Sequence, residues 1–304
     1  MASDTTRKYG HGEKSFPAEP DTMQGMLWQR GPLGIANPLF VASDIWLHRE
    51  LVLRLVSLSV SRRYKGSLLG LLWPFVSPLL TILIYTFAFS VVVKVRWPGQ
   101  ALGSHAEFAL AMFSGLVIYS VFSETVLAAP DLILSRPSLV KKVLFPLRML
   151  PLVGVGEALV HSVFALAVLL VMTVAITGGI PGTVLLAPLI FIPLVLLCLG
   201  LSWFLASAGV FVRDLSHLLQ AVVHLLFFLT PIFYPLSAVP EKVRWVLYLN
   251  PLTYLVTSFR ELILWQGRAP AWGGLLILTA ACLLICLAGY AWFAHTRADF
   301  SDVV

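Results

Sequence analysis

Charged side chains are scarce in this sequence. Only 12% of its 304 residues are Asp, Glu, Lys or Arg, and 59% are hydrophobic, whereas an ordinary soluble domain carries about 25% charged residues. The scarcity excludes an ordinary soluble domain. It predicts an all-α integral membrane protein, because uncharged runs of more than ~20 residues are typical of helices that cross a membrane.

The motifs of nucleotide-binding and hydrolytic sites are also missing. GHGEKS, at 10–15, has a faint likeness to a phosphate-binding loop, but the G-x-x-x-x-G-K-[ST] spacing is absent. There is no H-E-x-x-H, no G-x-S-x-G and no cysteine–histidine cluster. We therefore expect no catalytic, metal-binding or cofactor-binding residues in this chain. The energy for any transport would come from ion coupling or from another chain.

Cysteine is rare as well. The sequence has 3 cysteines, Cys198, Cys282 and Cys286, and each falls in an apolar run. This placement indicates small buried side chains and excludes a disulfide framework, which would need cysteines outside the membrane in an oxidising compartment.

What the sequence has instead is long uncharged runs, at 66–93, 158–212, 215–240 and 269–296. Each exceeds the ~20 residues that a helix needs to cross ~30 Å of hydrocarbon. Turn-forming residues at 178–182 divide the second run into two spans, and a weaker run at 108–130 is interrupted only by Glu124. The six predicted spans are 68–93, 108–130, 152–177, 183–211, 215–236 and 271–294, within a transmembrane domain at 67–296.

The basic residues predict which way the chain crosses the membrane. An even number of spans places both termini on one side, and that side carries fifteen of the 21 Lys and Arg residues. By the positive-inside rule both termini are cytoplasmic. We expect 1–40, which lacks the apolar core of a signal peptide, to be a disordered tail, and 297–304 to be a short cytoplasmic end. The net charge of +6 then reflects topology and attraction to anionic membrane lipids, with no reason to expect nucleic acid.

Residues 41–66 have the pattern of an amphipathic helix lying in the cytoplasmic interface. The polar residues that recur at helical spacing are Glu50, Arg54, Ser57, Ser61 and Lys65. A soluble helix packed on the protein's own loops is the alternative. Gly66 and Gly70 permit this helix to turn into the bilayer, and Pro74 and Pro78 would break or kink the first turns of the span.

The predicted cytoplasmic loop between the second and third spans is too apolar for a simple connector. Pro137 suits a helix start and Pro146 ends the pattern, which predicts a short basic helix with Lys141 and Lys142 beside an apolar stripe. Such a helix suits contact with a partner protein. A loop bound to lipid headgroups is the alternative.

The segment between the last two spans is also too apolar for a free loop. Four prolines, Pro231, Pro235, Pro240 and Pro251, divide it into pieces too short to span the membrane. A pair of re-entrant helices fits this pattern, because irregular backbone at membrane depth is tolerated where it is buried in protein or lines a wet cavity. An external cap lying on the membrane is the alternative.

Two acidic residues, Glu124 and Glu157, fall inside predicted spans. Each lies about six residues, roughly 9 Å, from the cytoplasmic end of its span. His161 is one turn beyond Glu157, and Arg148 or an arginine at the interface could reach either carboxylate. We expect structural ion pairs and not a proton relay, because no acid falls near a span centre.

Six motifs occur in order along the chain: RRYKGSLLGLLWP at 62–74, SPL at 77–79, LVKKVLFP at 139–146, FVRDL at 211–215, TPIFYP at 230–235 and NPL at 250–252. Together they resemble the motifs of ABC-type polysaccharide export permeases, the membrane subunits that export O-antigen, capsule or teichoic acid chains. The six motifs cover most of 45–290 in the family's order. The tail at 1–40 matches no motif of the family.

The resemblance implies a six-span half-transporter of the bacterial inner membrane. It would form a homodimer and bind two copies of a separate ATPase, which would hold ATP and Mg. Residues 137–148 would be the coupling helix in the ATPase groove, and 232–263 would form extracytoplasmic gate helices. The implied coupling residues are Leu139, Val140, Lys141, Lys142, Leu144, Phe145 and Arg148. The implied gate residues are Phe233, Tyr234, Trp245, Tyr248, Asn250 and Tyr254.

The implied cargo is a lipid-linked polysaccharide taken from the cytoplasmic leaflet. Arg62, Arg63 and Lys65 would form a cationic collar at the level of the lipid phosphates, where each charge contributes about 1 kcal/mol. Tyr64 beside them could stack on a sugar or reach the interface. Ordinary anchoring by positive charge is the alternative role of these cations.

Three other functions stay open at this point. A drug or lipid exporter of the same superfamily would not need an aromatic channel suited to sugars. An integral-membrane glycan-modifying enzyme would need a polar dyad in a cavity. An ion-coupled carrier would have charged groups at mid-membrane or matching broken helices in two halves.

Overall fold

The structure, a computed structural model, describes residues 38–92, 105–136, 145–264 and 269–300. Within these ranges all regular secondary structure is helical, which confirms the predicted all-α class. The α-helices are α3 (Pro38–Leu47), α4 (Arg49–Tyr64), α5 (Trp73–Tyr85), α6 (His105–Ala128), α7 (Asp131–Leu134), α9 (Leu150–Thr177), α10 (Ala187–Phe211), α11 (Leu215–Leu229), α12 (Glu241–Leu249), α13 (Pro251–Leu264) and α14 (Trp272–Thr296).

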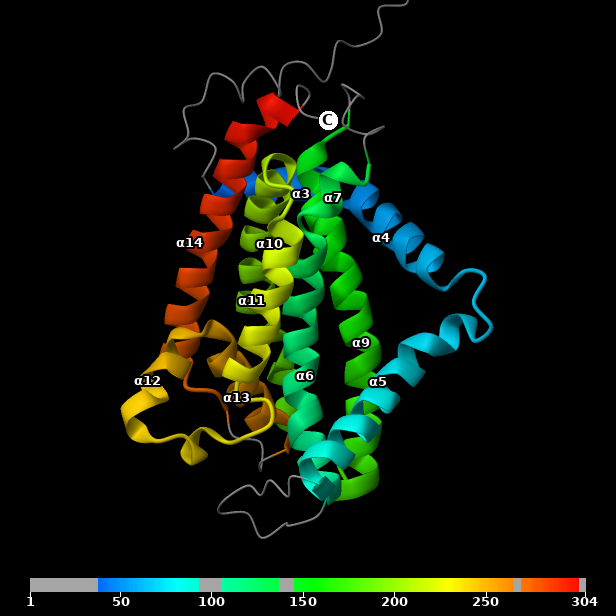
Figure 1. The fold of residues 1–304 in the computed structure, drawn as a ribbon, viewed down its shortest axis with the longest axis vertical. Helices are drawn as coiled ribbons and strands as arrows, with labels where there is room; N and C mark the ends of the chain where they lie inside the picture. The colour runs from blue at the N-terminus through cyan, green and yellow to red at the C-terminus, as the bar shows by residue number, and fades with distance from the viewer. Residues whose placement is uncertain (1–37, 93–104, 137–144, 265–268, 301–304) are drawn as a thin grey trace, which may run out of the picture.

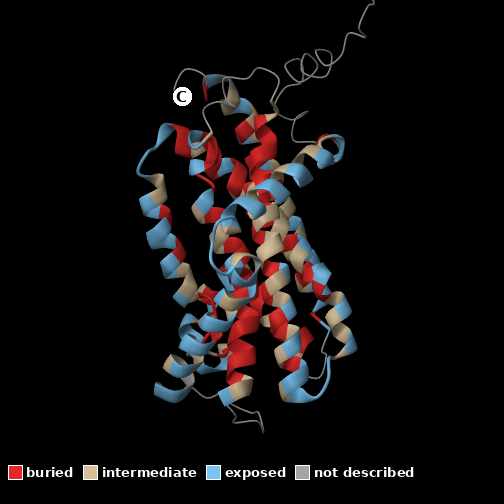
Figure 2. Cartoon of the chain, turned by 90° about the vertical axis from the view of Figure 1, so that its right-hand side faces the viewer, coloured by how far each residue is buried: buried red, intermediate tan, exposed pale blue. Residues whose placement is uncertain are grey.

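Four helical stretches in the described part are long and apolar enough to cross a membrane. They are His105–Ala128, Leu147–Thr177, Gly182–Phe211 and Trp272–Thr296, and they run side by side along the bundle (Figure 1). Within its apolar window α6 is 78% buried, against 28% for α9 and for α14. α6 is therefore the central helix. Buried residues gather in the interior of the bundle (Figure 2).

The predicted first and fifth spans are shorter than expected. Apolar helix covers Trp73–Phe89 in the first and Leu215–Leu229 in the fifth. The fifth ends at Leu229 and not at 236, because Thr230 is extended, as the residue before a proline prefers to be. At 1.5 Å per residue, the 15 residues of α11 measure about 22 Å, less than the ~30 Å of hydrocarbon.

A sharp corner connects α4 to α5. Gly66 and Gly70 both have positive φ, 87° and 48°, a backbone conformation that favours glycine. α5 starts at Trp73 with Pro74 in its first turn, where a proline fits a helix. α4 thus leads away from the bundle and α5 runs back to it (Figure 1). The predicted turn is confirmed, and Pro74 starts the helix where a break was expected; Pro78 lies inside it.

Small residues allow two helix pairs to pack closely. A Cβ atom on Gly289 of α14 would lie 2.1 Å from the carbonyl oxygen of Gly200 in α10. A Cβ on Gly156 of α9 would lie 2.6 Å from a methyl group of Val56 in α4. Close approach at small residues is typical of helices that associate in membranes.

The two short helices α12 and α13 lie at the end of the bundle opposite α3 and the C-terminus (Figure 1). We call the end with α3 and the C-terminus the terminal end. Pro240 precedes α12 and Pro251 begins α13, so prolines set the helix starts, as the sequence indicated. Within the predicted gate segment, helix covers 241–249 and 251–264. Between Leu229 and Glu241 the chain is irregular apart from one short turn at Leu236–Ala238.

Candidate functional site

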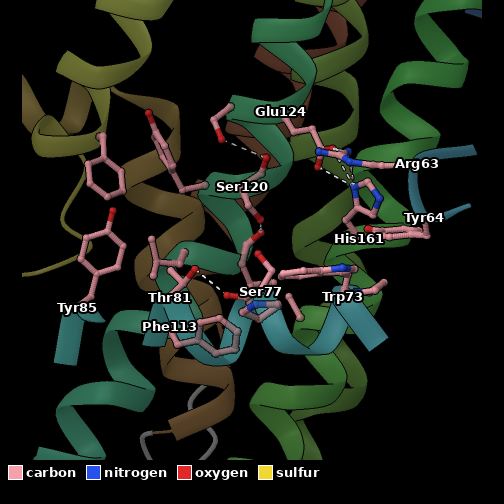
Figure 3. A pocket seen from close by; sticks show the side chains of 18 of the residues that line it. Arg63, Tyr64, Trp73, Ser77, Thr81, Tyr85, Phe113, Ser120, Glu124 and His161 are labelled. Atoms are coloured by element: carbon pink, nitrogen blue, oxygen red, sulfur yellow. Dashed lines mark hydrogen bonds and ion pairs between the residues drawn. The ribbon is translucent and has the colours of Figure 1, made fainter. Parts of the chain in front are cut away.

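A cavity of about 630 Å³ opens beside α5 and α6, and α4, α9 and α11 complete its wall. Figure 3 shows its side chains converging from these helices. Hydroxyl groups in the wall belong to Ser67, Ser77, Thr81, Ser120 and Ser123. Aromatic rings in the wall belong to Tyr64, Trp73, Tyr85, Phe113, Tyr119 and Phe227. The wall therefore combines apolar ring surface with many small polar groups.

Ring-to-ring contacts make one side of the cavity rigid. The Phe227 ring centroid lies 5.2 Å from that of Tyr119 and 6.0 Å from that of Tyr85. Phe233 packs 5.5 Å from Tyr85 and stacks 4.2 Å from Phe89. The Tyr119 hydroxyl donates a hydrogen bond to the Val223 carbonyl. Offset and edge-on rings at these separations attract one another, so the aromatic wall is fixed before any ligand arrives.

An ion-paired cluster lies at the part of the cavity nearest α4. Arg63 donates to Glu124, and His161 Nδ1 lies 2.8 and 3.0 Å from the two Glu124 oxygens. A carboxylate only accepts hydrogen bonds, so this Nδ1 carries the proton. Burial alone would lower the pKa of the Arg63 guanidinium, but the hydrogen bond and charge of Glu124 outweigh it and raise that pKa. The predicted pairing of Glu124 with an arginine at the interface is confirmed, and the partner is Arg63.

The other predicted residues of this region lie apart. Arg62 and Lys65 are exposed, whereas Tyr64 is half-buried with its ring edge-on to His161, at 6.0 Å. Glu157 is half-buried and acts on Arg63 only through its charge. Of the three cations of the predicted collar, only Arg63 therefore lines the cavity.

A second ion pair is buried at the terminal end. Arg148 Nη2 donates to Asp44 Oδ1 at 2.7 Å, Nε lies 2.6 Å from Oδ2, and Asp44 is 3% exposed. The Tyr290 hydroxyl donates to Asp44, and the Trp203 indole donates to the Arg148 carbonyl. Sequence reasoning missed Asp44, whose signal was a single acid in an apolar stretch. The family resemblance implied that Arg148 contacts the ATPase, but its side chain is buried against Asp44 inside the bundle.

Most of the predicted coupling residues cannot be placed. Leu139, Val140, Lys141, Lys142 and Leu144 lie outside the described residues. Phe145 is half-buried against the core of the bundle. The described chain resumes at Phe145, three residues before Arg148, so the Asp44 pair holds the turn at Leu147–Met149 to α3.

The predicted gate residues divide into two groups. Phe233 is buried, Tyr234 donates to the Phe228 carbonyl at 2.9 Å, and Tyr254 donates to the Ala271 carbonyl at 2.6 Å. Asn250 donates to the Thr230 hydroxyl and accepts from the Leu252 amide. These four hold the segment together. Trp245 and Tyr248, in contrast, are 61% and 65% exposed on α12.

A buried arginine, one of the six basic residues that the charge count assigns to the side opposite the termini, fixes α13 to α6. Arg260 is 1% exposed. Its Nε donates to the Ala111 carbonyl at 2.8 Å, and its Nη2 to the Pro231 and Ile232 carbonyls at 3.0 and 3.1 Å. The only sequence signal was a lone cation among apolar residues of α13. Among the described residues, no group of three or more His, Cys, Asp or Glu side chains could hold a metal ion.

Comparison with known proteins identifies the family. The model of the ABC-2 type transporter family matches residues 50–264. The chain is 32% identical over 263 residues to the O-antigen export system permease protein RfbA of Myxococcus xanthus, covering 86% of this chain and 98% of that protein. It is 26% identical over 257 residues to the O-antigen export system permease protein RfbA of Klebsiella pneumoniae, covering 84% and 95%. The chain therefore belongs to the ABC-2 type transporter family, as a multi-pass membrane subunit that works with an ATPase on a separate chain.

Proposed function

We propose that this chain is the permease through which an ABC transporter moves a lipid-linked O-antigen-type polysaccharide out of the cytoplasmic leaflet of a bacterial inner membrane. The observation that carries the proposal is the cavity beside α5 and α6, with its aromatic and hydroxyl wall. The names of the two relatives, both O-antigen export permeases, support the same cargo.

The cavity wall suits a sugar chain because sugars have the same two kinds of surface. Their C–H faces pack on aromatic rings, and their hydroxyls bind polar groups. Thr81, Ser120 and Ser123 donate to carbonyls of their own helices, so their oxygens stay available as acceptors for sugar hydroxyls. A drug or lipid tail would make no use of these acceptors. A glycan-modifying enzyme is disfavoured because Glu124, the acid in the cavity wall, is already held by Arg63 and His161.

For the architecture we propose six spans, with α5 and α11 as the short first and fifth spans and both termini in the cytoplasm. α12 and α13 would be re-entrant gate helices at the outer side. Their irregular connections are compatible with membrane depth, because Arg260 and Asn250 satisfy buried backbone groups there. A homodimer with two ATPase copies, which hold ATP and Mg, would complete the transporter.

Movement of the ATPase would reach the bundle through the predicted coupling helix at 137–148. At the end of that segment, Arg148 is bound to Asp44 of α3, and α3 leads into α4 with Arg63 at the cavity. A push on the coupling helix would therefore act on α3 and α4 as well as on α9. Arg62 and Lys65, exposed beside the cavity, would attract the lipid phosphate.

The cavity can be tested by filling it. Ser120 faces the cavity from α6, so Ser120→Trp should strongly reduce ATP-dependent export of lipid-linked O-polysaccharide in vesicles that contain the permease and its ATPase. Val163→Trp is the matched control, because Val163 is 62% exposed on α9 and does not line the cavity. Full export by Ser120→Trp would exclude the cavity as the path. Export by wild-type protein in an ion gradient without ATPase would exclude the ABC mechanism.

A further inference from the structure

Three polar side chains follow one face of α11. His217, Gln220 and His224 are spaced three and four residues apart, and all three are exposed. We call them the polar stripe. The remaining exposed surface of α11 is apolar, with Leu218 and Leu225 among its large residues. The stripe is thus a narrow polar band on a helix that is otherwise suited to lipid.

The stripe reaches the middle of the bundle. Tyr119 donates a hydrogen bond to the carbonyl of Val223, next to His224, so the two helices are level at this point. Tyr119 lies nine residues before the end of α6 at Ala128, which is about 14 Å along the axis. His224 of α11 is therefore level with the middle part of α6, well away from the headgroups at either end of α6.

A polar stripe at this depth is costly if it faces lipid. Imidazole and amide groups lose their hydrogen bonds in hydrocarbon, and polar residues in spans usually face the bundle interior or a water-filled cavity. His224 Nδ1 donates to the Gln220 carbonyl at 2.7 Å, since a carbonyl only accepts. Because His224 is exposed, its Nε2 is accessible to a further partner.

Helical geometry connects the stripe with the cavity wall. Phe227 lines the cavity, and Gln220 lies seven residues before it. At 100° per residue the two side chains point within about 20° of each other, separated by roughly 10 Å along α11. Gln220 therefore extends the line of the cavity wall toward the terminal end of the bundle, and His217 and His224 lie within about 60° of Gln220 around the helix.

We propose that the polar stripe is a water-exposed, sugar-binding wall of the export path. Amide and imidazole groups both donate and accept hydrogen bonds, which suits the hydroxyl groups of a polysaccharide. Binding at several weak sites in a row also suits a chain that must keep moving, because a cargo has to leave each site as well as reach it. This proposal rests on the proposed function, and it adds the residues that the sugar contacts between the cytoplasm and the aromatic wall.

Cysteine labelling tests whether the stripe is wet. The native cysteines Cys198, Cys282 and Cys286 are all buried, so the background is low. His224→Cys should react at least ~10-fold faster with a membrane-impermeant methanethiosulfonate than Leu225→Cys, because only a hydrated cysteine forms the reactive thiolate. Leu225 is the matched control: it is at the same depth and 66% exposed, but on the apolar face. In vesicles with the ATPase, labelling His224→Cys should also block polysaccharide export.

Each outcome decides a different point. Equal labelling of His224→Cys and Leu225→Cys overturns the wet wall, and so does an oxidative crosslink between two His224→Cys copies, which would make the stripe a contact between protomers. Fast labelling with export undiminished overturns the sugar contact. If wild-type protein with its ATPase exports no polysaccharide, the proposed function fails, and the labelling still decides whether the stripe is wet.

Discussion

The contact between α10 and α14 gives a quantitative test of the packing. In the Gly289→Ala variant the new methyl carbon would lie 2.1 Å from the Gly200 carbonyl oxygen, whereas 3.4–4 Å is ordinary contact. The helices must separate by more than 1 Å, since backbone cannot yield as a side chain does. Overpacking of this kind costs 1–3 kcal/mol, and backbone contact places this site at the upper end. We expect the free energy of unfolding to fall by about 3 kcal/mol.

The measurement is an unfolding titration in mixed detergent micelles, with Gly273→Ala as the control. Gly273 lies in the same helix, and nothing is within 4 Å of a Cβ built there. Alanine should stabilise α14 at that position by up to ~1 kcal/mol through helix propensity. If Gly289→Ala unfolds at the same denaturant concentration as Gly273→Ala, the two helices are farther apart than described, and the reasoning is refuted.

Two further predictions concern the outer segment and the coupling helix. Arg260→Met should lower the free energy of unfolding by about 2–4 kcal/mol, because three buried carbonyls lose their donor. Arg244→Met removes one bond to the Val239 carbonyl and should cost less in the same titration. If the two variants are equally stable, Arg260 does not fix α13 to α6. Lys141→Glu combined with Lys142→Glu should weaken ATPase co-purification without affecting membrane insertion; unchanged co-purification would favour the lipid-headgroup role.

The long helices and their turns could be read from the sequence because they depend on local properties. Uncharged length predicts a span, and the predicted hairpin turn at 178–182 is present, with Gly178 at φ 79° ending α9. The corner at Gly66 and the helix starts at Pro240 and Pro251 are local in the same sense. Helix ends near prolines are harder to predict: hydrophobicity continues past Thr230 to 236, but the fifth helix ends at Leu229.

The ion pairs could not be read from the sequence because they depend on how helices cross. The sequence indicates that Glu124 has an ion-pair partner, but that partner, Arg63, is 61 residues away, and Arg148 binds Asp44 at a separation of 104 residues. Arg148 and Arg260 look like interfacial charges when only neighbours in the chain are considered. They can be buried because other segments supply carbonyl and carboxylate partners. The residue pattern of a single helix does not show which partners will be nearby.

The three basic residues at the end of α4 are therefore not equivalent, although their sequence suggested one collar. Arg63 is bound to Glu124, which also holds His161, so a lipid phosphate would have to compete with a carboxylate already in place. All three residues are exposed, but only Arg63 has an ion-pair partner among the described residues, and attraction to a negative surface acts over about a Debye length without a fixed partner. In the proposed transporter, Arg62 and Lys65 are suited to collecting the lipid phosphate. Arg63 is suited to keeping α4 against α6 and α9, and so to setting the width of the cavity through which the sugar follows.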